Sequence, residues 1–88
     1  MVPGSRFFHL APVGKPYLKD SLYLVAFGEN LRRLRTLKGF SQQSLANEVG
    51  MSPNHVFQIE KGVVNTSVSH CKAIADALGV PVIALFDF

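Results

Sequence analysis

The stretch FSQQSLANEVGMSPNHVFQIEKG, residues 40–62, places two short helical patterns on either side of a turn. Ser41 is a good N-cap for the first helix, whose apolar positions point inward until Gly50 supplies a left-handed C-terminal residue. Ser52 caps the second helix, and Pro53 is tolerated at its first position, where the missing N–H would have had no partner. The stretch therefore predicts two helices joined by a turn of about three or four residues, which is the helix-turn-helix geometry.

Helical spacing of apolar residues extends on both sides of this stretch. From Phe27 onward, apolar residues recur every three or four positions, which indicates one face of an earlier helix. Polar residues 65–67 offer caps for a fourth helix, whose apolar residues keep helical spacing up to Gly79. Pro81 is expected to open a short fifth helix. The predicted fold is an all-α, five-helix domain over residues 27–88.

Residues 1–26 form an N-terminal extension that proline and glycine interrupt, and the pattern leaves its structure open. The segment SLYLVAF, residues 21–27, is apolar on both faces of a strand and suits either a strand or an extension of the following helix. The apolar side chains of the extension need burial, which predicts packing against the domain or against a partner subunit.

Composition excludes several classes of protein. Eighty-eight residues suffice for one domain with one core. The single cysteine, Cys71, excludes an internal disulfide framework and is expected to be an inert core residue on the fourth helix. The three histidines fall at no zinc spacing, so we expect no metal and no cofactor. No stretch reaches the ~20 apolar residues that span a bilayer, and the opening lacks a secretory signal, so we expect a cytoplasmic protein without membrane association.

The formal net charge of +3 favours an acidic partner such as nucleic acid. Residues 27–88 carry six basic and five acidic residues, a net charge of +1, so any electrostatic attraction must come from local clusters. One such cluster lies on the first helix and comprises Arg32, Arg33, Arg35 and Lys38. For Arg32, Arg33 and Lys38, phosphate binding and a solubilising surface are equally compatible with the sequence.

The second helix of the motif has a polar outer face. If Val56 and Ile59 point inward, a rotation of about 100° per residue turns four side chains outward. These outward residues are Asn54, Phe57, Gln58 and Lys61. Side-chain amides at such positions can donate to and accept from the major-groove edge of adenine.

In combination these elements resemble the lambda-repressor-like, Xre-type helix-turn-helix transcription regulators. The resemblance covers roughly Phe27 to Phe86 and rests on FGENLRRLR, the stretch quoted above, the connector Gly62–Asn65 and AIADALGV. It implies sequence-specific binding of duplex DNA by a homodimer that occupies an operator and regulates transcription. The compact length and the GVVN connector look especially like the controller proteins of restriction-modification systems, although phage and antitoxin regulators share these features.

We expect DNA contacts at eight positions, all but His55 implied by the resemblance: Gln42, Ser52, Pro53, Asn54, His55, Gln58, Lys61 and Asn65. Gln42 lies near a DNA phosphate at the start of its helix, and Lys61 and Asn65 match positions that approach the backbone. The positions that face bases are Ser52, Pro53, Asn54 and Gln58. His55 is expected to touch a phosphate. Because no third orienting residue accompanies Ser52 and His55, we do not expect an enzyme.

Three further positions, Arg35, Glu60 and Phe57, complete the comparison with the family. Arg35 and Glu60 match a pair that the family often joins as a partly buried salt bridge, and the sequence agrees because both lie beside apolar positions. Phe57 stands where the family usually has a small or polar residue. Its ring could pack on DNA sugars or lean on Val63 and Val64, and both alternatives stay open.

The apolar residues near both termini are suited to contact with a protein partner. The C-terminal ones exceed what so small a core can cover, and we expect them at the dimer interface: Val82, Ile83, Leu85, Phe86 and Phe88. The rival function from another class is a protein-interaction module, such as an antitoxin whose apolar N-terminal segment masks a toxin.

Overall fold

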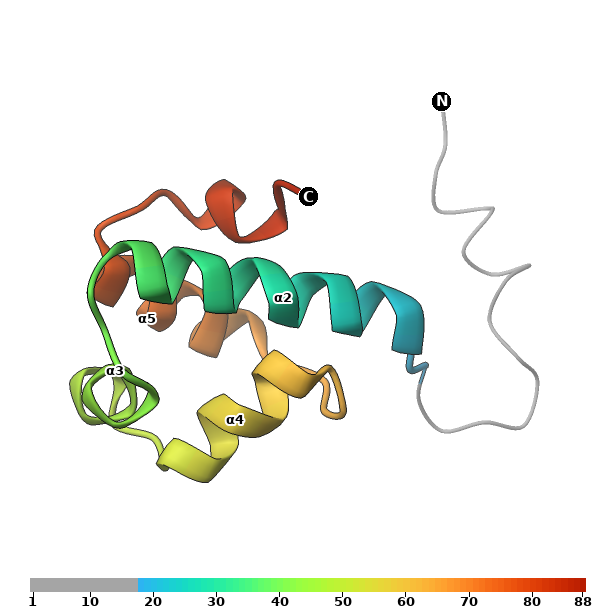
Figure 1. Cartoon of the computed structure of the whole chain (residues 1–88). Coiled ribbons are helices and arrows are strands. Elements are labelled where there is room, and N and C mark those ends of the chain that lie inside the picture. The colour runs from blue at the N-terminus through green and yellow to red at the C-terminus, as the bar shows by residue number, and fades with distance from the viewer. Residues whose placement is uncertain (1–17) are drawn as a thin grey trace.

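The computed structural model describes residues 18–88, which form one small helical domain (Figure 1). Its elements are α2 (Ser21–Leu37), α3 (Gln42–Val49), α4 (Pro53–Lys61), α5 (Val68–Leu78) and the 3-10 helix η1 (Val82–Phe86). The all-α prediction is confirmed. The fifth element is a 3-10 helix rather than an α-helix. Residues 1–17 of the predicted extension lie outside the described residues.

Helix α2 begins six residues before Phe27. The segment SLYLVAF is helical, so the second of its two predicted alternatives is right. Asp20 caps the helix, because its carboxylate accepts a hydrogen bond from the backbone N–H of Tyr23 at 3.1 Å. A cap at this position explains why the helix begins at Ser21 rather than further along the chain.

Two glycines allow α2 to cross the end of α4 backbone to backbone. A Cβ added at Gly28 would overlap the carbonyl oxygens of Ile59 and Glu60. Gly62 has φ +74°, and a Cβ there would lie 2.5 Å from the Cα of Val25. Both positions therefore need glycine for space, and Gly62 also needs it for its left-handed conformation. The close crossing brings Arg35 of α2 beside Glu60 in the last turn of α4.

Helices α3 and α4 and the three residues between them have the predicted helix-turn-helix arrangement. The Ser41 Oγ accepts from the backbone N–H three residues on at 2.9 Å, and the Ser52 Oγ does the same at 3.0 Å. Gly50 ends α3 in the left-handed conformation with φ +84°, and Pro53 occupies the first turn of α4. Each of these local signals was readable in the sequence.

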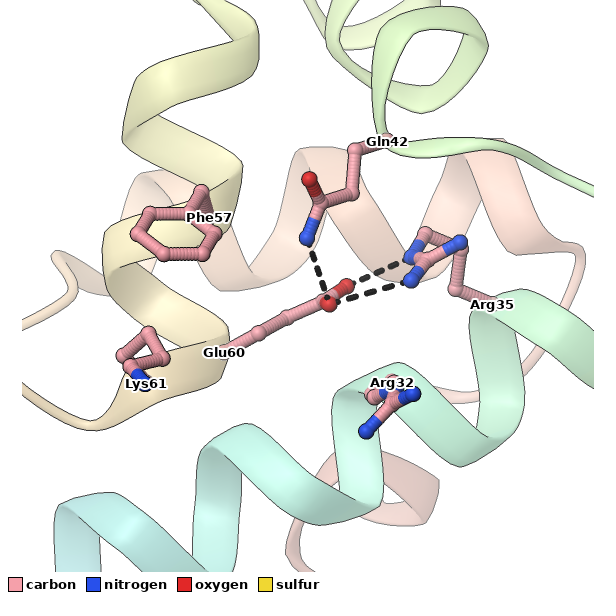
Figure 2. A pocket seen from close by; sticks show the side chains of 6 residues that line it. All are labelled: Arg32, Arg35, Gln42, Phe57, Glu60 and Lys61. Carbon is pink, nitrogen blue, oxygen red and sulfur yellow. Dashed lines mark hydrogen bonds and ion pairs between the residues drawn. The ribbon is translucent and has the colours of Figure 1, made fainter.

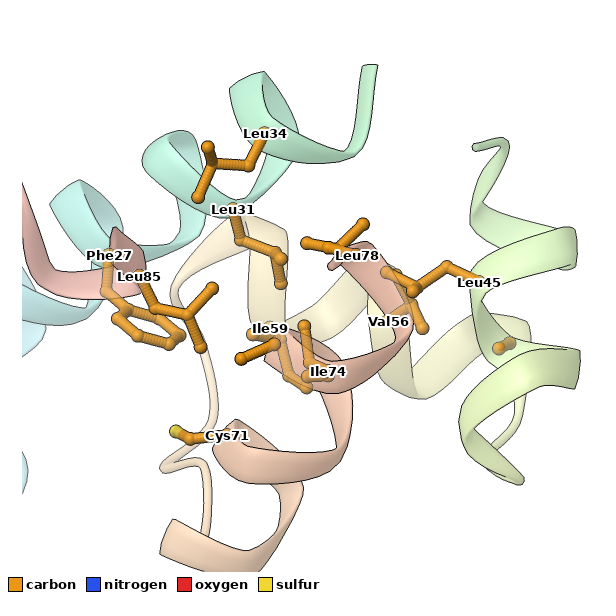
Figure 3. Close-up of a cluster of buried hydrophobic side chains, with 12 residues drawn as sticks. Phe27, Leu31, Leu34, Leu45, Val56, Ile59, Cys71, Ile74, Leu78 and Leu85 are labelled. Atoms are coloured by element: carbon orange, nitrogen blue, oxygen red, sulfur yellow. The ribbon is translucent and has the colours of Figure 1, made fainter. Parts of the chain in front are cut away.

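The core joins all five elements (Figure 3). Its largest fully buried side chains are Leu31, Leu45, Val56, Ile59, Ile74 and Leu85. Cys71 is buried beside them on α5, as predicted. Because α3 and α4 share this core with α2 and α5, the outer face of α4 is presented on a fixed support.

The C-terminal segment corrects one prediction. Leu85 is fully buried, so its assignment to a dimer interface is wrong. A 3-10 helix has three residues per turn, which points Val82 and Leu85 to the same side. That side faces the core, while Ile83 is 76% exposed and Phe86 is 42% exposed.

Asn30 holds this C-terminal segment against α2, a role that its position in the sequence does not predict. Its buried Nδ2 donates to the carbonyl oxygens of Ala84 and Leu85, both at 2.9 Å. The Asn30 Oδ1 accepts from Arg33 at 2.8 Å. The amide nitrogen and oxygen of Asn30 are thus both hydrogen-bonded, and the side chain anchors η1 against α2.

Candidate nucleic-acid interface

The outer face of α4 is arranged as the helical periodicity predicted. Val56 and Ile59 are buried in the core. On the opposite side Asn54, Phe57 and Lys61 are exposed, and Gln58 is partly exposed. The helix thus presents two side-chain amides one turn apart, and each amide can donate one hydrogen bond and accept another.

The first turn of α4 combines exposed and engaged polar groups. The Ser52 Oγ is used as the helix cap, which leaves its own proton free to donate. Pro53 offers only apolar atoms to a partner. The His55 ring stands edge-on to the ring of His70, with centroids 5.1 Å apart, so it lies where α4 meets the first turn of α5.

The predicted ion pair between α2 and α4 is present and is part of a larger network (Figure 2). The Arg35 Nε lies 2.6 Å from the Glu60 Oε2, and the Arg35 Nη2 lies 3.1 Å from the Oε1. The Arg35 Nη1 also donates to the carbonyl oxygen of Phe40 at 2.8 Å. The two side chains are only 12% and 4% exposed. This bidentate pair therefore ties α2 to α4 in a partly dry environment.

Gln42 belongs to the same network. Its Nε2 donates to the Glu60 Oε1 at 3.0 Å, which joins α3 to the ion pair. An amide nitrogen carries two protons, so one N–H of Gln42 is left for a second acceptor. The side chain expected near a DNA phosphate is thus held in a fixed orientation by a buried carboxylate.

Lys61 and Asn65 lie at the carboxyl end of α4 and just beyond it. The Lys61 Nζ sits over the Phe57 ring, 5.8 Å from its centroid. The Asn65 Nδ2 approaches the carbonyl oxygen of Leu18 at 3.4 Å, and the nearby Lys19 donates to the connector at 2.9 Å. The chain that precedes α2 is therefore attached to the connector that follows α4.

Residues 18–88 contain neither a membrane-spanning helix nor a metal-binding cluster. No helix in this part of the chain is long and apolar enough to cross a bilayer. In the same residues no three His, Cys, Asp or Glu side chains gather closely enough to hold a metal ion. Burial raises the pKa of the Cys71 thiol, which disfavours the reactive thiolate form.

Two capped helices joined by a three-residue turn, with an amide-bearing outer face on the second, define a helix-turn-helix protein. The helix-turn-helix family HTH_3 matches residues 31–85, which is more than half of the chain. The chain belongs to this family.

Several known proteins resemble the chain over most of its length. The control protein C.BamHI of Bacillus amyloliquefaciens is 36% identical over 63 residues, which cover 70% of this chain and 78% of that protein. The crystal structure of the restriction-modification controller protein C.AhdI from Aeromonas hydrophila matches with a TM-score of 0.70 at 41% identity, over 72% of this chain and 96% of that chain. The hypothetical transcription factor NHTF from Neisseria matches with a TM-score of 0.69 at 32% identity, over 82% of each chain. The predicted resemblance to helix-turn-helix regulators and controller proteins is confirmed.

Proposed function

We propose that this protein binds duplex DNA sequence-specifically as a homodimer and regulates transcription from an operator. The outer face of α4 carries this proposal, because it exposes Asn54 and shows part of Gln58 on a helix supported by the core. Side-chain amides can pair in bidentate fashion with adenine in the major groove, which admits an α-helix. The similarity to the controller proteins C.BamHI and C.AhdI supports a regulatory role.

Within this proposal the eight predicted contacts divide into two groups. Bases are contacted by Ser52, Pro53, Asn54 and Gln58. Pro53 can offer only apolar contact, such as with a thymine methyl group. The DNA backbone is contacted by Gln42, His55, Lys61 and Asn65. Such contacts position the protein on the duplex without reading its sequence.

The homodimer follows from the limited reach of one helix-turn-helix unit. A single unit reads only a few base pairs, whereas a two-fold pair reads two half-sites about 34 Å apart or a multiple of that distance. Apolar residues suited to such an interface remain exposed near the C-terminus, since Ile83 is 76% and Phe88 is 53% exposed. Phe86 lies between them and is also exposed. Contact between two copies would cover these side chains.

Selection of bound sequences from a random duplex pool tests the DNA-binding proposal. We expect enrichment of a pseudo-palindromic sequence whose half-sites have the spacing of a two-fold dimer. If circular dichroism shows that the protein is folded and the pool is still not enriched in any sequence, sequence-specific binding is rejected.

Sedimentation at micromolar concentration tests the dimer separately. The wild-type chain should sediment with twice the monomer mass, and Ile83→Glu should reduce it to the monomer mass. Leu37→Glu is the matched control, because Leu37 is 70% exposed at the far end of α2 and should leave the mass unchanged. A monomeric wild type, both alone and on the selected duplex, contradicts the dimer.

A protein-interaction module remains the second candidate, because Leu22 is 86% exposed on the first turn of α2 and Val25 is 41% exposed one turn later. A stable complex with an unrelated protein, together with no enrichment of DNA, would favour this function. A salt-sensitive mobility shift on the selected duplex would favour the regulator.

A further inference from the structure

The basic residues of α2 lie on different sides of the helix. Arg33 donates its Nε and Nη2 to the Asn30 Oδ1 at 3.3 and 2.8 Å, and it borders a surface hollow with Asp87 and Phe88. Arg35 is engaged by the buried carboxylate of α4. Within residues 18–88, by contrast, no hydrogen bond or ion pair holds the Arg32 guanidinium. Only Arg32 of the three is both exposed and directed to the α4 side of the molecule.

Arg32 lines a hollow of about 400 Å³ that α2, α3 and α4 form together (Figure 2). The other lining residues are Arg35, Gln42, Phe57, Glu60 and Lys61. Three cationic side chains against one carboxylate leave the hollow with a net charge of +2. The carboxylate already accepts hydrogen bonds from Arg35 and Gln42, and its side chain is only 4% exposed. The charge that faces solvent is therefore that of Arg32 and Lys61.

The Lys61 ammonium lies over the ring of Phe57. The ammonium is 5.8 Å from the centroid of the Phe57 ring, a distance at which a cation is attracted to the ring face. Phe57 is one turn before Lys61 on the outer face of α4, so the ring supports the lysine side chain at the edge of the hollow. A long, flexible side chain held in this way loses less freedom when it meets a ligand.

We infer that Arg32 and Lys61 form a binding site for the DNA backbone, in which both side chains bind phosphate and Phe57 positions Lys61. The inference rests on the proposed DNA binding by α4 and deepens it. A duplex that receives the outer face of α4 must carry a strand past the end of that helix, where α2 crosses it. Arginine and lysine there offer only donors and full positive charge, which suits phosphate oxygens.

The dependence of affinity on salt tests the site. Arg32→Gln and Lys61→Gln should each weaken binding to the selected duplex and to random duplex by a similar factor, about tenfold. Each should also flatten the slope of log affinity against log salt by about 0.9. Arg33→Gln removes the same charge from the neighbouring residue and retains a donor for Asn30, so its slope should equal that of the wild type. An Arg32→Gln slope that equals the wild-type slope overturns the inference.

A double-variant measurement tests the positioning role of Phe57. Phe57→Leu should weaken binding in the wild-type background and have no further effect when Lys61→Gln is already present. An equal loss in both backgrounds would show that Phe57 touches DNA directly and would overturn its positioning role. The proposed function fails separately from this inference. It fails if the wild-type chain does not bind DNA, whereas the inference fails if the wild type binds and Arg32→Gln behaves like Arg33→Gln.

Discussion

Removing the Glu60 carboxylate should destabilise the domain strongly. The Glu60 side chain is 4% exposed, and its removal would leave the Arg35 guanidinium, 12% exposed, with only the Phe40 carbonyl as a partner at 2.8 Å. Breaking a buried pair from one side costs about 3–5 kcal/mol, because the remaining charge stays uncompensated. We therefore predict that Glu60→Ala lowers the free energy of unfolding by about 3–5 kcal/mol.

The ion pair between Lys72 and Asp76 on α5 provides a matched control. Its N···O distance of 2.7 Å is almost the same as the 2.6 Å between Arg35 and Glu60. Its side chains are 63% and 61% exposed, so burial is what separates the two pairs. An exposed pair four residues apart on a helix is worth about 0.3–0.5 kcal/mol. Asp76→Ala should therefore cost about a tenth as much as Glu60→Ala.

Urea unfolding followed by the helical circular dichroism signal measures both changes. With a slope of about 1 kcal/mol per molar urea for a small domain, Glu60→Ala should lower the midpoint by several molar. Glu60→Gln keeps an acceptor for Arg35 and should cost less. The Arg35→Ala, Glu60→Ala double variant should cost less than the sum of the single variants. A Glu60→Ala loss no larger than that of Asp76→Ala would refute the structural role of the pair.

Three further predictions concern the packing of the domain. Gly28→Ala should lower the thermal midpoint, because the added Cβ would overlap the carbonyl oxygens of Ile59 and Glu60. Alanine in place of glycine usually stabilises a helix interior by about 1 kcal/mol, so a raised midpoint would contradict the close crossing. Asn30→Ala should cost about 1–3 kcal/mol in urea unfolding, because two carbonyls of η1 lose their donor, and a negligible loss would show that this anchor is unnecessary. Cys71 should react with iodoacetamide at neutral pH much more slowly in the folded chain than in denaturant, because burial covers the thiol and raises its pKa; equal rates would contradict this.

Local features of the fold could be predicted from the sequence because their causes are local. A serine cap depends on a backbone N–H only three residues away, as at Ser41 and Ser52. A left-handed helix end depends on a single glycine, as at Gly50. The outer face of α4 follows from its period and from two buried positions. The helix-turn-helix unit was therefore readable before any contact between distant residues was known.

Features that depend on distant contacts could not be predicted in this way. Leu85 is an apolar residue near the C-terminus, which suits an interface as well as a core. Only the packing of η1 on α2 shows that it belongs to the core. Asn30 resembles any polar residue on a helix, and its role depends on carbonyl oxygens more than fifty residues away. Arg32 and Arg33 are adjacent and identical in type, yet the crossing of α2 over α4 gives them different surroundings.

Gln58 gives the most direct test of the claim that α4 reads DNA. Gln58→Ala should weaken binding to the selected duplex by about 1–3 kcal/mol, should change binding to random duplex little, and should relax the preference at one base pair when the selection is repeated. Gln43→Ala is the matched control, because this glutamine is exposed on α3 and pairs with Asn47 at 3.2 Å. Both affinities are measured by fluorescence anisotropy at one fixed salt concentration. A loss confined to the selected duplex is the predicted result, and equal losses on selected and random DNA would contradict α4 as the reading helix.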